Sequence, residues 1–342
     1  MRSVRSDLAC EYVMANLLDP LVVKGLRLKN RLVMPPMGTD LATNKGEVTE
    51  KHLAYYKPRA REMGLVIVEH SYVDFGGRYT STQIGVHDDG LIPGLRKLAG
   101  VIHESGAVAA IQINHSGGKC VEDVCGSQPV GPSSIKYWKE PTRGLEVSEI
   151  RELIRKFGDG AKRAVEAGFD IVEIHASHGW LLNQFASPLT NKRTDQYGGS
   201  LSNRFRFPLD VTREVRKRVG EKYPVFFRLG ADDFTPEGLT IEESKTMAPK
   251  IVEAGADVMD ISGGLCGVYH PTDKGPGFFM PIAEEIRKVV SVPVIGVGGI
   301  RTAELADQYI REGRIDLVAI GRALMSDPDW GVKAMESLKR KR

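Results

Sequence analysis

The chain has 342 residues, enough for about two domains of ordinary size or for one α/β barrel, which can hold roughly 250 residues or more. Hydrophobic residues make up 42% of the chain and charged residues 27%, which excludes a disordered or fibrous protein. The net charge is +3 and the one basic run lies at residues 339–342, which excludes the clustered positive surface of a nucleic-acid-binding protein.

The sequence contains no apolar stretch of the roughly 18–20 residues that a membrane span requires, and its first residues lack the apolar run of a secretory signal. We therefore expect a cytoplasmic protein that does not contact a membrane. Its 4 cysteines are too sparse for a disulfide scaffold or a metal site. The neighbouring Cys120 and Cys125 are predicted to be reduced thiols in a loop.

Short runs rich in β-branched residues recur along the chain and predict eight strands, at residues 32–37, 65–70, 108–114, 171–176, 224–230, 257–263, 293–299 and 316–322. Segments with the apolar spacing of helices separate most of these runs. The clearest helix is predicted to follow an N-cap at Ser148, and another begins at the capping box of Thr240 and Glu243. Because the strand runs are almost continuously apolar, they indicate a parallel sheet buried on both faces. Eight such units predict a single (β/α)8 TIM barrel of the α/β class.

A doubly wound sheet is the alternative architecture, but it would more often carry a glycine-rich turn after its first strand. Here that strand ends in Pro35, Pro36, Met37 and Gly38, which do not form a dinucleotide-binding fingerprint. We expect residues 17–335 to form the barrel, residues 1–16 an extension outside it and residues 336–342 a frayed basic tail. The long connections 115–147 and 181–201 are expected to overhang the mouth of the barrel.

Polar side chains gather at the carboxyl ends of the predicted strands. Burying an unpaired charge costs on the order of several kcal/mol, so these side chains predict a polar ligand at that end of the barrel. The alternative is a network of polar side chains that satisfy one another. The side chains concerned belong to Glu69, His70, Gln112, Asn114, His115, Glu173, His175, Arg228, Asp260 and Ser262.

The last two predicted strands carry the features of a phosphate site. One runs into Gly298 and Gly299 ahead of a helix that is predicted to begin near Thr302, and the other ends in Gly321 and Arg322 ahead of another helix. Glycines let backbone N–H groups approach an anion, and an arginine can bind phosphate oxygens with two hydrogen bonds. Phosphate alone fits FMN, pyridoxal phosphate and a phosphorylated sugar equally well.

His175 and His178 form the motif with the strongest chemical content, at the end of the fourth predicted strand. Two imidazoles there can donate two hydrogen bonds to one oxygen, which polarises a carbonyl or holds an oxyanion. A metal site is disfavoured because the pair lacks a carboxylate or a third histidine as partner.

Several segments together resemble the Old Yellow Enzyme family of FMN-dependent ene-reductases. They are residues 28–31 (Leu-Lys-Asn-Arg), 34–37 (Met-Pro-Pro-Met), 174–179 (Ile-His-Ala-Ser-His-Gly), the run 187–200 and the strand around Gln112. The resemblance covers residues 17–330 and implies FMN as the cofactor and NAD(P)H as the electron donor. The implied reaction reduces the C=C bond of a small α,β-unsaturated carbonyl compound.

The resemblance also implies a role for each matching residue. His175 and His178 would bind the substrate oxygen, Gln112 the pyrimidine edge of the flavin, and Arg228 the region near its N1 and O2. The other flavin contacts would come from Pro35, Pro36, Met37, Gly38 and His70, and the phosphate contacts from Gly298, Gly299, Gly321 and Arg322.

One position departs from the family pattern, because Trp180 stands where these enzymes usually carry a tyrosine, two residues after the second histidine. An indole N–H cannot serve as a general acid, so the proton for the α-carbon must come from water or another group; Tyr72 and Tyr269 are candidates by location. The departure keeps two alternatives open, a flavin-linked dehydrogenase or demethylase and a flavin-binding protein with little turnover. The substrate, the choice between NADH and NADPH, and assembly into a homo-oligomer are not determined by the sequence.

Overall fold

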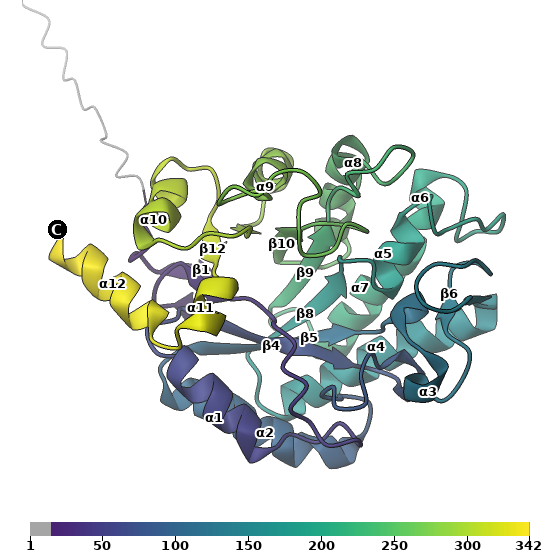
Figure 1. The fold of residues 1–342 in the computed structure, drawn as a ribbon, viewed down its shortest axis with the longest axis horizontal. Coiled ribbons are helices and arrows are strands. Elements are labelled where there is room, and N and C mark those ends of the chain that lie inside the picture. The colour runs from purple at the N-terminus through teal and green to yellow at the C-terminus, as the bar shows by residue number, and fades with distance from the viewer. Residues whose placement is uncertain (1–14, 342) are drawn as a thin grey trace, which may run out of the picture.

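The predicted strands form a closed, all-parallel barrel of eight in the computed structural model, which describes residues 15–341 (Figure 1). The pairing of β12 with β3 closes the ring, so the single (β/α)8 barrel is confirmed and the doubly wound sheet is excluded. In ring order the strands are β3 (Leu32–Met34), β4 (Leu65–Tyr72), β5 (Val108–Asn114), β8 (Ile171–Ala176), β9 (Val225–Gly230), β10 (Val258–Ser262), β11 (Val294–Gly296) and β12 (Leu317–Ala319).

Helices cover the outside of the barrel (Figure 1). The longer ones are α1 (Glu50–Arg59), α2 (Ile92–Glu104), α4 (Val147–Glu166), α7 (Arg206–Val219), α8 (Ile241–Glu253), α9 (Met280–Arg287), α10 (Ala303–Arg311) and α12 (Trp330–Arg340). Shorter ones are α3 (Glu122–Cys125), α5 (Leu181–Ala186), α6 (Leu201–Arg204), α11 (Arg322–Ser326) and the 3₁₀ turns Phe75–Gly77, Asp89–Leu91 and Gly117–Lys119. Within residues 15–341, no helix has the length and apolar character needed to cross a membrane.

The predicted helix starts are confirmed at Thr240 and at Thr302, which caps α10. The predicted cap at Ser148 is wrong, because α4 already begins at Val147 with Glu146 as its N-cap residue. The Glu146 N–H donates to the carboxylate of Glu149 at 2.8 Å, and this reciprocal capping box fixes the start of the helix.

An antiparallel hairpin of β1 (Leu21–Val23) and β2 (Leu26–Leu28) precedes the barrel. Its buried Val23 and Leu28 pack with the first residues of barrel strands, among them Leu65 and Ile171. Because these residues lie at the amino ends of their strands, the hairpin closes that end of the barrel. A site is therefore left to the carboxyl-terminal end, where this fold usually carries it.

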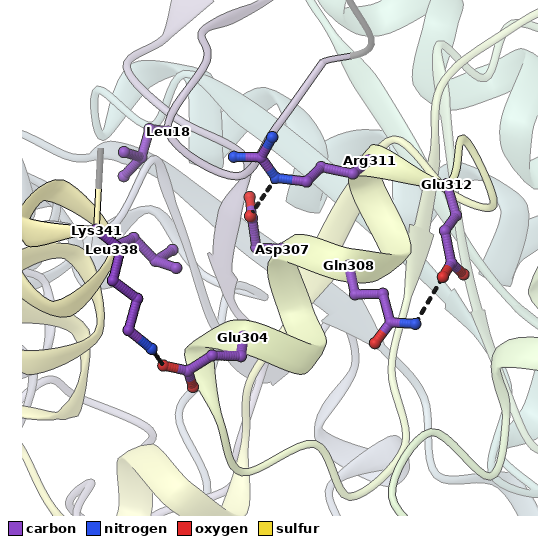
Figure 2. Close-up of a pocket in the computed structure, with 8 residues that line it drawn as sticks. All are labelled: Leu18, Glu304, Asp307, Gln308, Arg311, Glu312, Leu338 and Lys341. Carbon is purple, nitrogen blue, oxygen red and sulfur yellow. Dashed lines mark hydrogen bonds and ion pairs between the residues drawn. The ribbon is translucent and has the colours of Figure 1, made fainter.

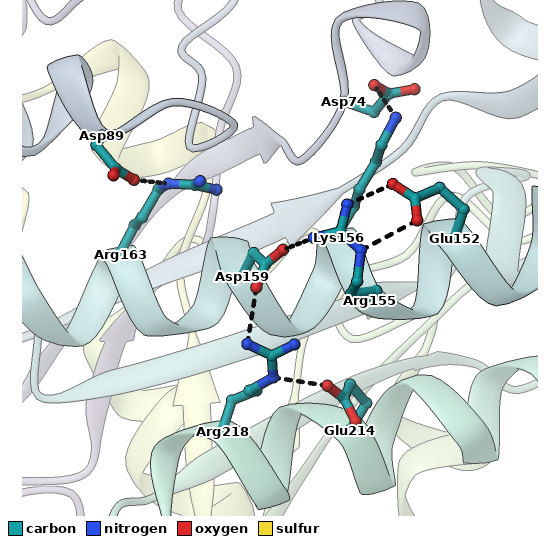
Figure 3. A network of polar contacts seen from close by, with 9 residues as sticks. All are labelled: Asp74, Asp89, Glu152, Arg155, Lys156, Asp159, Arg163, Glu214 and Arg218. Atoms are coloured by element: carbon teal, nitrogen blue, oxygen red, sulfur yellow. Dashed lines mark hydrogen bonds and ion pairs between the residues drawn. The ribbon is translucent and has the colours of Figure 1, made fainter.

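Ion pairs connect the outer helices α4 and α7 to each other and to the loops beside them (Figure 3). Asp159 of α4 accepts from Arg155 at 2.5 Å and from Arg218 of α7 at 2.8 Å. Lys156 donates to Asp74, in the loop after β4, at 2.8 Å. Exposed pairs contribute little individually, so this network orients α4 and α7 rather than holding the fold together.

The two ends of the described chain meet at α10 (Figure 2). The Leu17 N–H donates to the Asp307 carboxylate at 2.8 Å, and the Lys341 ammonium pairs with Glu304 at 2.5 Å. Residues 336–340, which we expected to be a frayed tail, instead complete α12, and Lys339 there pairs with Glu62 at 3.2 Å. Of the expected extension 1–16, residues 1–14 lie outside the described part of the chain.

The connection after β5 contains the two neighbouring cysteines. Cys120 and Cys125 form a disulfide with a Cα–Cα distance of 6.3 Å, so the prediction of reduced thiols is wrong. The short helix α3, which ends at Cys125, turns the chain back and brings the two Cα atoms within disulfide range. The same connection contains the paired strands β6 (Val130–Gly131) and β7 (Arg143–Gly144).

Candidate active site

A cavity of about 570 Å³ opens at the carboxyl-terminal end of the barrel, opposite the β1–β2 hairpin. Every residue predicted to contact the flavin, its phosphate or the substrate oxygen lines this cavity except Gln112. The other polar residues predicted at the strand ends that do not line it are Glu69, Asn114, His115, Glu173 and Asp260. The predicted residues in its wall are Pro35, Pro36, Met37, Gly38, His70, His175, His178, Arg228, Gly298, Gly299, Gly321 and Arg322. Seven of the eight barrel strands contribute to this wall through the residues at or just beyond their ends.

Gln112 lies in the layer beneath the cavity. It is fully buried, and its side-chain N–H donates to the carboxylate of Glu173, its register partner on β8, at 2.8 Å. Its side-chain carbonyl oxygen has no hydrogen-bond partner in residues 15–341. A contact from Gln112 to a ligand stays a prediction.

The two histidines are held by serines. His175 ends the inward row of β8, and its Nδ1 lies 3.2 Å from the hydroxyl of Ser177, while Nε2 of His178 lies 2.7 Å from the hydroxyl of Ser262. His178 adopts a left-handed backbone conformation (φ 57°), which turns the chain so that both imidazoles reach one cavity. Burial holds the pKa of both imidazoles well below the usual value, and the charge of Arg228 acts in the same direction.

Both imidazoles are therefore neutral near pH 7. When the serine hydroxyls donate to Nδ1 of His175 and Nε2 of His178, the proton of each ring sits on the other nitrogen. Each ring then has one N–H left for a ligand. The pair can donate two hydrogen bonds to one oxygen, which agrees with the chemistry that the motif predicts.

Arg228 supplies a fixed cation in the cavity wall. It is buried and pairs with Asp260 on the neighbouring strand at 3.2 Å, while its Nε has no hydrogen-bond partner in the described chain. Burial raises the pKa of Asp260, and burial together with Asp260 raises the pKa of Glu173 well above its usual value. The pKa of Glu173 is shifted further than that of Asp260, so burial favours the protonated form of Glu173, and Asp260 is the ion-pair partner of Arg228.

The loops after β11 and β12 form a cradle for an anion. Gly298 (φ 141°) and Gly299 (φ 71°) have backbone conformations that other residues rarely adopt, and a Cβ on Gly298 would lie 2.7 Å from the backbone nitrogen of Phe279. The guanidinium of Arg322 lies 5.1 Å from the ring centroids of both Tyr269 and Phe278. An arginine positioned by two aromatic rings suits a phosphate group.

Lys119 and Trp138 also line the cavity. Trp138 belongs to the connection 115–147, which we expected to overhang the mouth and to select the substrate, whereas the sequence does not predict Lys119 as a site residue. The Lys119 ammonium donates to the backbone carbonyl of His178 at 2.5 Å, and it lies 5.1 Å from the ring of Trp180 and 5.2 Å from that of Trp138. Burial lowers the pKa of Lys119 to about 8. The sequence signal was weak, because Lys119 stands in a turn that follows β5 and has no periodic pattern.

Trp180, the departure from the family pattern, is buried in the cavity wall at the start of α5. Its ring centroid lies 5.2 Å from that of His70 and 6.0 Å from that of His175. Tyr72 is fully buried away from the cavity lining, which removes it as a proton donor, whereas Tyr269 lies at the cavity mouth and is 55% exposed.

The fold and the site together define a flavin oxidoreductase barrel, with a phosphate cradle, a buried arginine and a histidine pair around one cavity. The chain belongs to the NADH:flavin oxidoreductase / NADH oxidase family, whose sequence model matches residues 16–341. Membership confirms the expectations of FMN as the cofactor and of an NAD(P)H-dependent oxidoreductase. The unpartnered Arg228 Nε and the glycine cradle fit this cofactor.

Three similar proteins illustrate the family. An NADH oxidase of Thermoanaerobacter brockii is 42% identical over 94% of this chain, which spans about half (51%) of that enzyme's length. An NADPH dehydrogenase of a Geobacillus strain is 39% identical, and the match covers 94% of each chain. The solved Old Yellow Enzyme homologue of Zymomonas mobilis superposes with a TM-score of 0.83 at 27% identity and covers 94% of this chain and 93% of its own. The predicted resemblance to the Old Yellow Enzyme family is thereby confirmed.

Proposed function

We propose that this protein is an ene-reductase, which uses NAD(P)H to reduce the C=C bond of an α,β-unsaturated carbonyl compound. The observation that carries the proposal is the pair of neutral imidazoles, His175 and His178, in the same cavity as the phosphate cradle and Arg228. When bound, FMN supplies the site that accepts a hydride from NAD(P)H and passes it to the substrate.

The residues of the cavity wall bind and orient the cofactor. Gly298, Gly299, Gly321 and Arg322 would hold its phosphate, and the segment 35–38 and His70 would contact its ring, since all of them line the cavity. Arg228 would stabilise negative charge on the ring, because its guanidinium is buried and paired with Asp260. Gln112, in the layer beneath the cavity, would accept a hydrogen bond from the cofactor through its side-chain carbonyl oxygen, which has no partner in residues 15–341.

The histidine pair binds and activates the substrate. Two N–H groups on the carbonyl oxygen withdraw electron density from the conjugated C=C bond and make its β-carbon electrophilic. The hydrogen bonds to Ser177 and Ser262 fix the orientation of the two rings, so that their N–H groups point into the cavity. The imidazoles do not lose their protons; they hold the oxygen while charge develops on it.

Stopped-flow measurement of the two half-reactions tests the proposal. The protein purified with FMN is expected to be reduced by NADH or NADPH and then reoxidised by a simple enone in the absence of oxygen. His175→Ala and His178→Ala are each expected to slow the enone step by about 100-fold, since each removes one donor to the developing oxyanion. A yellow protein that NAD(P)H reduces but that no enone, nitroalkene or dienoyl thioester reoxidises would contradict the proposal.

A second candidate is a flavin-linked dehydrogenase or demethylase that runs on the same barrel in the oxidative direction. Trp180 favours this candidate, because Trp180 cannot act as a general acid and a reaction in the oxidative direction does not require protonation of a carbon atom. Reduction of the bound flavin by an amine or alcohol, faster than by NAD(P)H, would support this candidate. A cytoplasmic location, assembly into a homo-oligomer and the boundary of the N-terminal extension stay predictions.

A further inference from the structure

The cavity contains a buried amine beside Trp180, the residue that stands where the family pattern has a tyrosine. We propose that Lys119 donates the proton that completes C=C reduction, replacing the tyrosine whose position Trp180 occupies. The inference rests on the proposed function, because it assigns a donor to the second step of the same reaction.

The geometry places the Lys119 amine on the turn that carries the second imidazole. Its Nζ donates to the carbonyl of His178 at 2.5 Å, and a Cβ on Gly179 would lie 3.1 Å from its Cε and 3.3 Å from its Nζ. The ring of Trp180 is 5.1 Å away. The amine thus contacts His178, Gly179 and Trp180 in succession, beside the histidines that hold the substrate oxygen.

The turn itself is fixed in place. Gly179 has a positive φ of 70°, and the Tyr137 hydroxyl donates to its carbonyl at 3.1 Å. A Cβ at position 179 would overlap the Tyr137 hydroxyl and lie close to the Lys119 side chain, so the glycine leaves room for both. Lys119 reaches this place from the 3₁₀ turn Gly117–Lys119, directly after β5.

The other titratable groups of the cavity are poorer donors. Burial raises the pKa of the Cys266 thiol to about 12, and Arg228 keeps its proton at any physiological pH. Tyr269 is 55% exposed, and its ring lies 5.1 Å from the guanidinium of Arg322.

The three imidazoles of the cavity are poor donors for a different reason. Burial lowers the pKa of His70 and holds those of His175 and His178 well below the usual value, so all three are neutral near pH 7. A neutral imidazole that gave up its proton would become an imidazolate, which costs far more than the loss of a proton from an ammonium.

The environment of Lys119 suits an amine that gives and regains a proton. In the described part of the chain no carboxylate forms an ion pair with it, and burial lowers its pKa to about 8, near the operating pH that favours general acid catalysis. The rings of Trp138 and Trp180 stabilise its charged form. The titratable groups that face it are His70, Tyr137, His175, His178 and Cys266.

NAD(P)H is the only reductant that this reaction requires, and water is the final source of the proton. One hydride reaches the β-carbon, and the π electrons of the C=C bond move to the α-carbon and the carbonyl oxygen, where His175 and His178 hold the resulting enolate. An N–H bond of the Lys119 ammonium then breaks, its electron pair stays on nitrogen, and the proton forms the new C–H bond at the α-carbon. The neutral amine regains a proton from water.

Lys119→Arg is the most informative variant, because arginine keeps the positive charge but does not release a proton. The enone-dependent half-reaction is expected to slow by about 100-fold or more, and at least 30-fold more than the NAD(P)H-dependent half-reaction, in line with the contribution of general acid catalysis of roughly 10²–10⁴-fold. Lys97→Arg, on an exposed position of α2, is the matched control and is expected to change neither rate.

The pH profile separates a proton donor from a cation that only positions the substrate. In the wild type the enone-dependent rate is expected to fall above about pH 8, where the amine loses its proton, and this fall is expected to disappear in Lys119→Arg. Equal enone-dependent rates and equal pH profiles in Lys119→Arg and the wild type would overturn the role of Lys119. Failure of the wild type to reduce any enone would overturn the proposed function instead.

A measurement without turnover gives an independent readout. In protein carrying ¹³C at lysine Cε, one lysine signal is expected to titrate at about pH 8 and to be missing from the spectrum of Lys119→Arg. If this signal titrated above pH 10, as that of an exposed lysine does, the proposal would be overturned even if the variant were slow.

Discussion

The Nε2 atom of His178 lies 2.7 Å from the hydroxyl of Ser262, the last residue of β10. This contact joins the turn after β8 to a strand two places further around the ring. Because it occupies one ring nitrogen, it sets which nitrogen of His178 faces the substrate.

Ser262→Ala tests that relationship. The imidazole of His178 loses the partner that fixes its orientation, and a hydrogen bond of this kind is worth about 1 kcal/mol, so kcat/KM for an enone is expected to fall by about 5-fold. The NAD(P)H-dependent half-reaction is expected to change less. An unchanged kcat/KM would mean that the backbone turn alone positions His178.

Arg228→Met is expected to lower the midpoint potential of the bound flavin. The variant removes the buried cation that stabilises the reduced, anionic ring, and a loss of about 1.5–3 kcal/mol corresponds to roughly 30–60 mV for a two-electron couple. Dye-coupled reductive titration measures the potential. Arg228→Lys keeps the charge and is expected to shift it less; equal shifts in the two variants would show that charge is not the cause.

Gly298→Ala is expected to weaken FMN binding by at least tenfold. At φ 141° an alanine is strained, and its Cβ would approach the backbone nitrogen of Phe279 to 2.7 Å, so the loop that holds the phosphate must shift. Fluorescence titration of the flavin-free protein gives the dissociation constant. Gly100→Ala in α2, where a Cβ meets nothing within 4 Å, is the matched control and is expected to leave binding unchanged.

His115 makes the stability of the fold depend on pH. Burial lowers its pKa to about 4, so below the usual value of about 6.5 the unfolded state binds a proton that the folded state does not. The contribution of this group to the free energy of unfolding is therefore constant above about pH 6.5 and falls by about 3 kcal/mol on acidification to pH 4.

Urea unfolding of the wild type and of His115→Gln between pH 4 and pH 7 measures this dependence. The variant is expected to be less stable at pH 7, because the Gly117 N–H loses its 3.0 Å bond to the imidazole, but to lose less stability on acidification. Parallel pH dependences in the two proteins would assign the acid sensitivity to other buried groups.

The strands could be predicted closely where side-chain character changes sharply at both ends. Residues 108–114 and 171–176 match β5 and β8 at both boundaries. The strands predicted at 293–299 and 316–322 are shorter in the structure, Val294–Gly296 and Leu317–Ala319, because the glycines that follow leave the extended conformation. Gly298 has a positive φ, and Gly321 is the N-cap residue of α11.

The site could be predicted to the extent that the barrel itself assembles it. Residues at the ends of parallel strands must meet at one mouth, so the histidine pair, Arg228 and Arg322 share a cavity as expected. The position of Gln112 one layer below the cavity depends on the register of β5 against β8, which the sequence does not determine, and its contact with the flavin stays a prediction. The sequence does not predict Lys119 as a site residue, because its location depends on the turn after β5 and on the room left by Gly179.

The stoichiometry of anaerobic turnover tests the proposed ene-reduction most directly. With NADPH or NADH and an enone in the absence of oxygen, we expect one saturated carbonyl product for each nicotinamide oxidised, and loss of both in a His175→Ala, His178→Ala double variant that still binds FMN. Nicotinamide oxidation without saturated product, or product formed at the wild-type rate by the double variant, would contradict it.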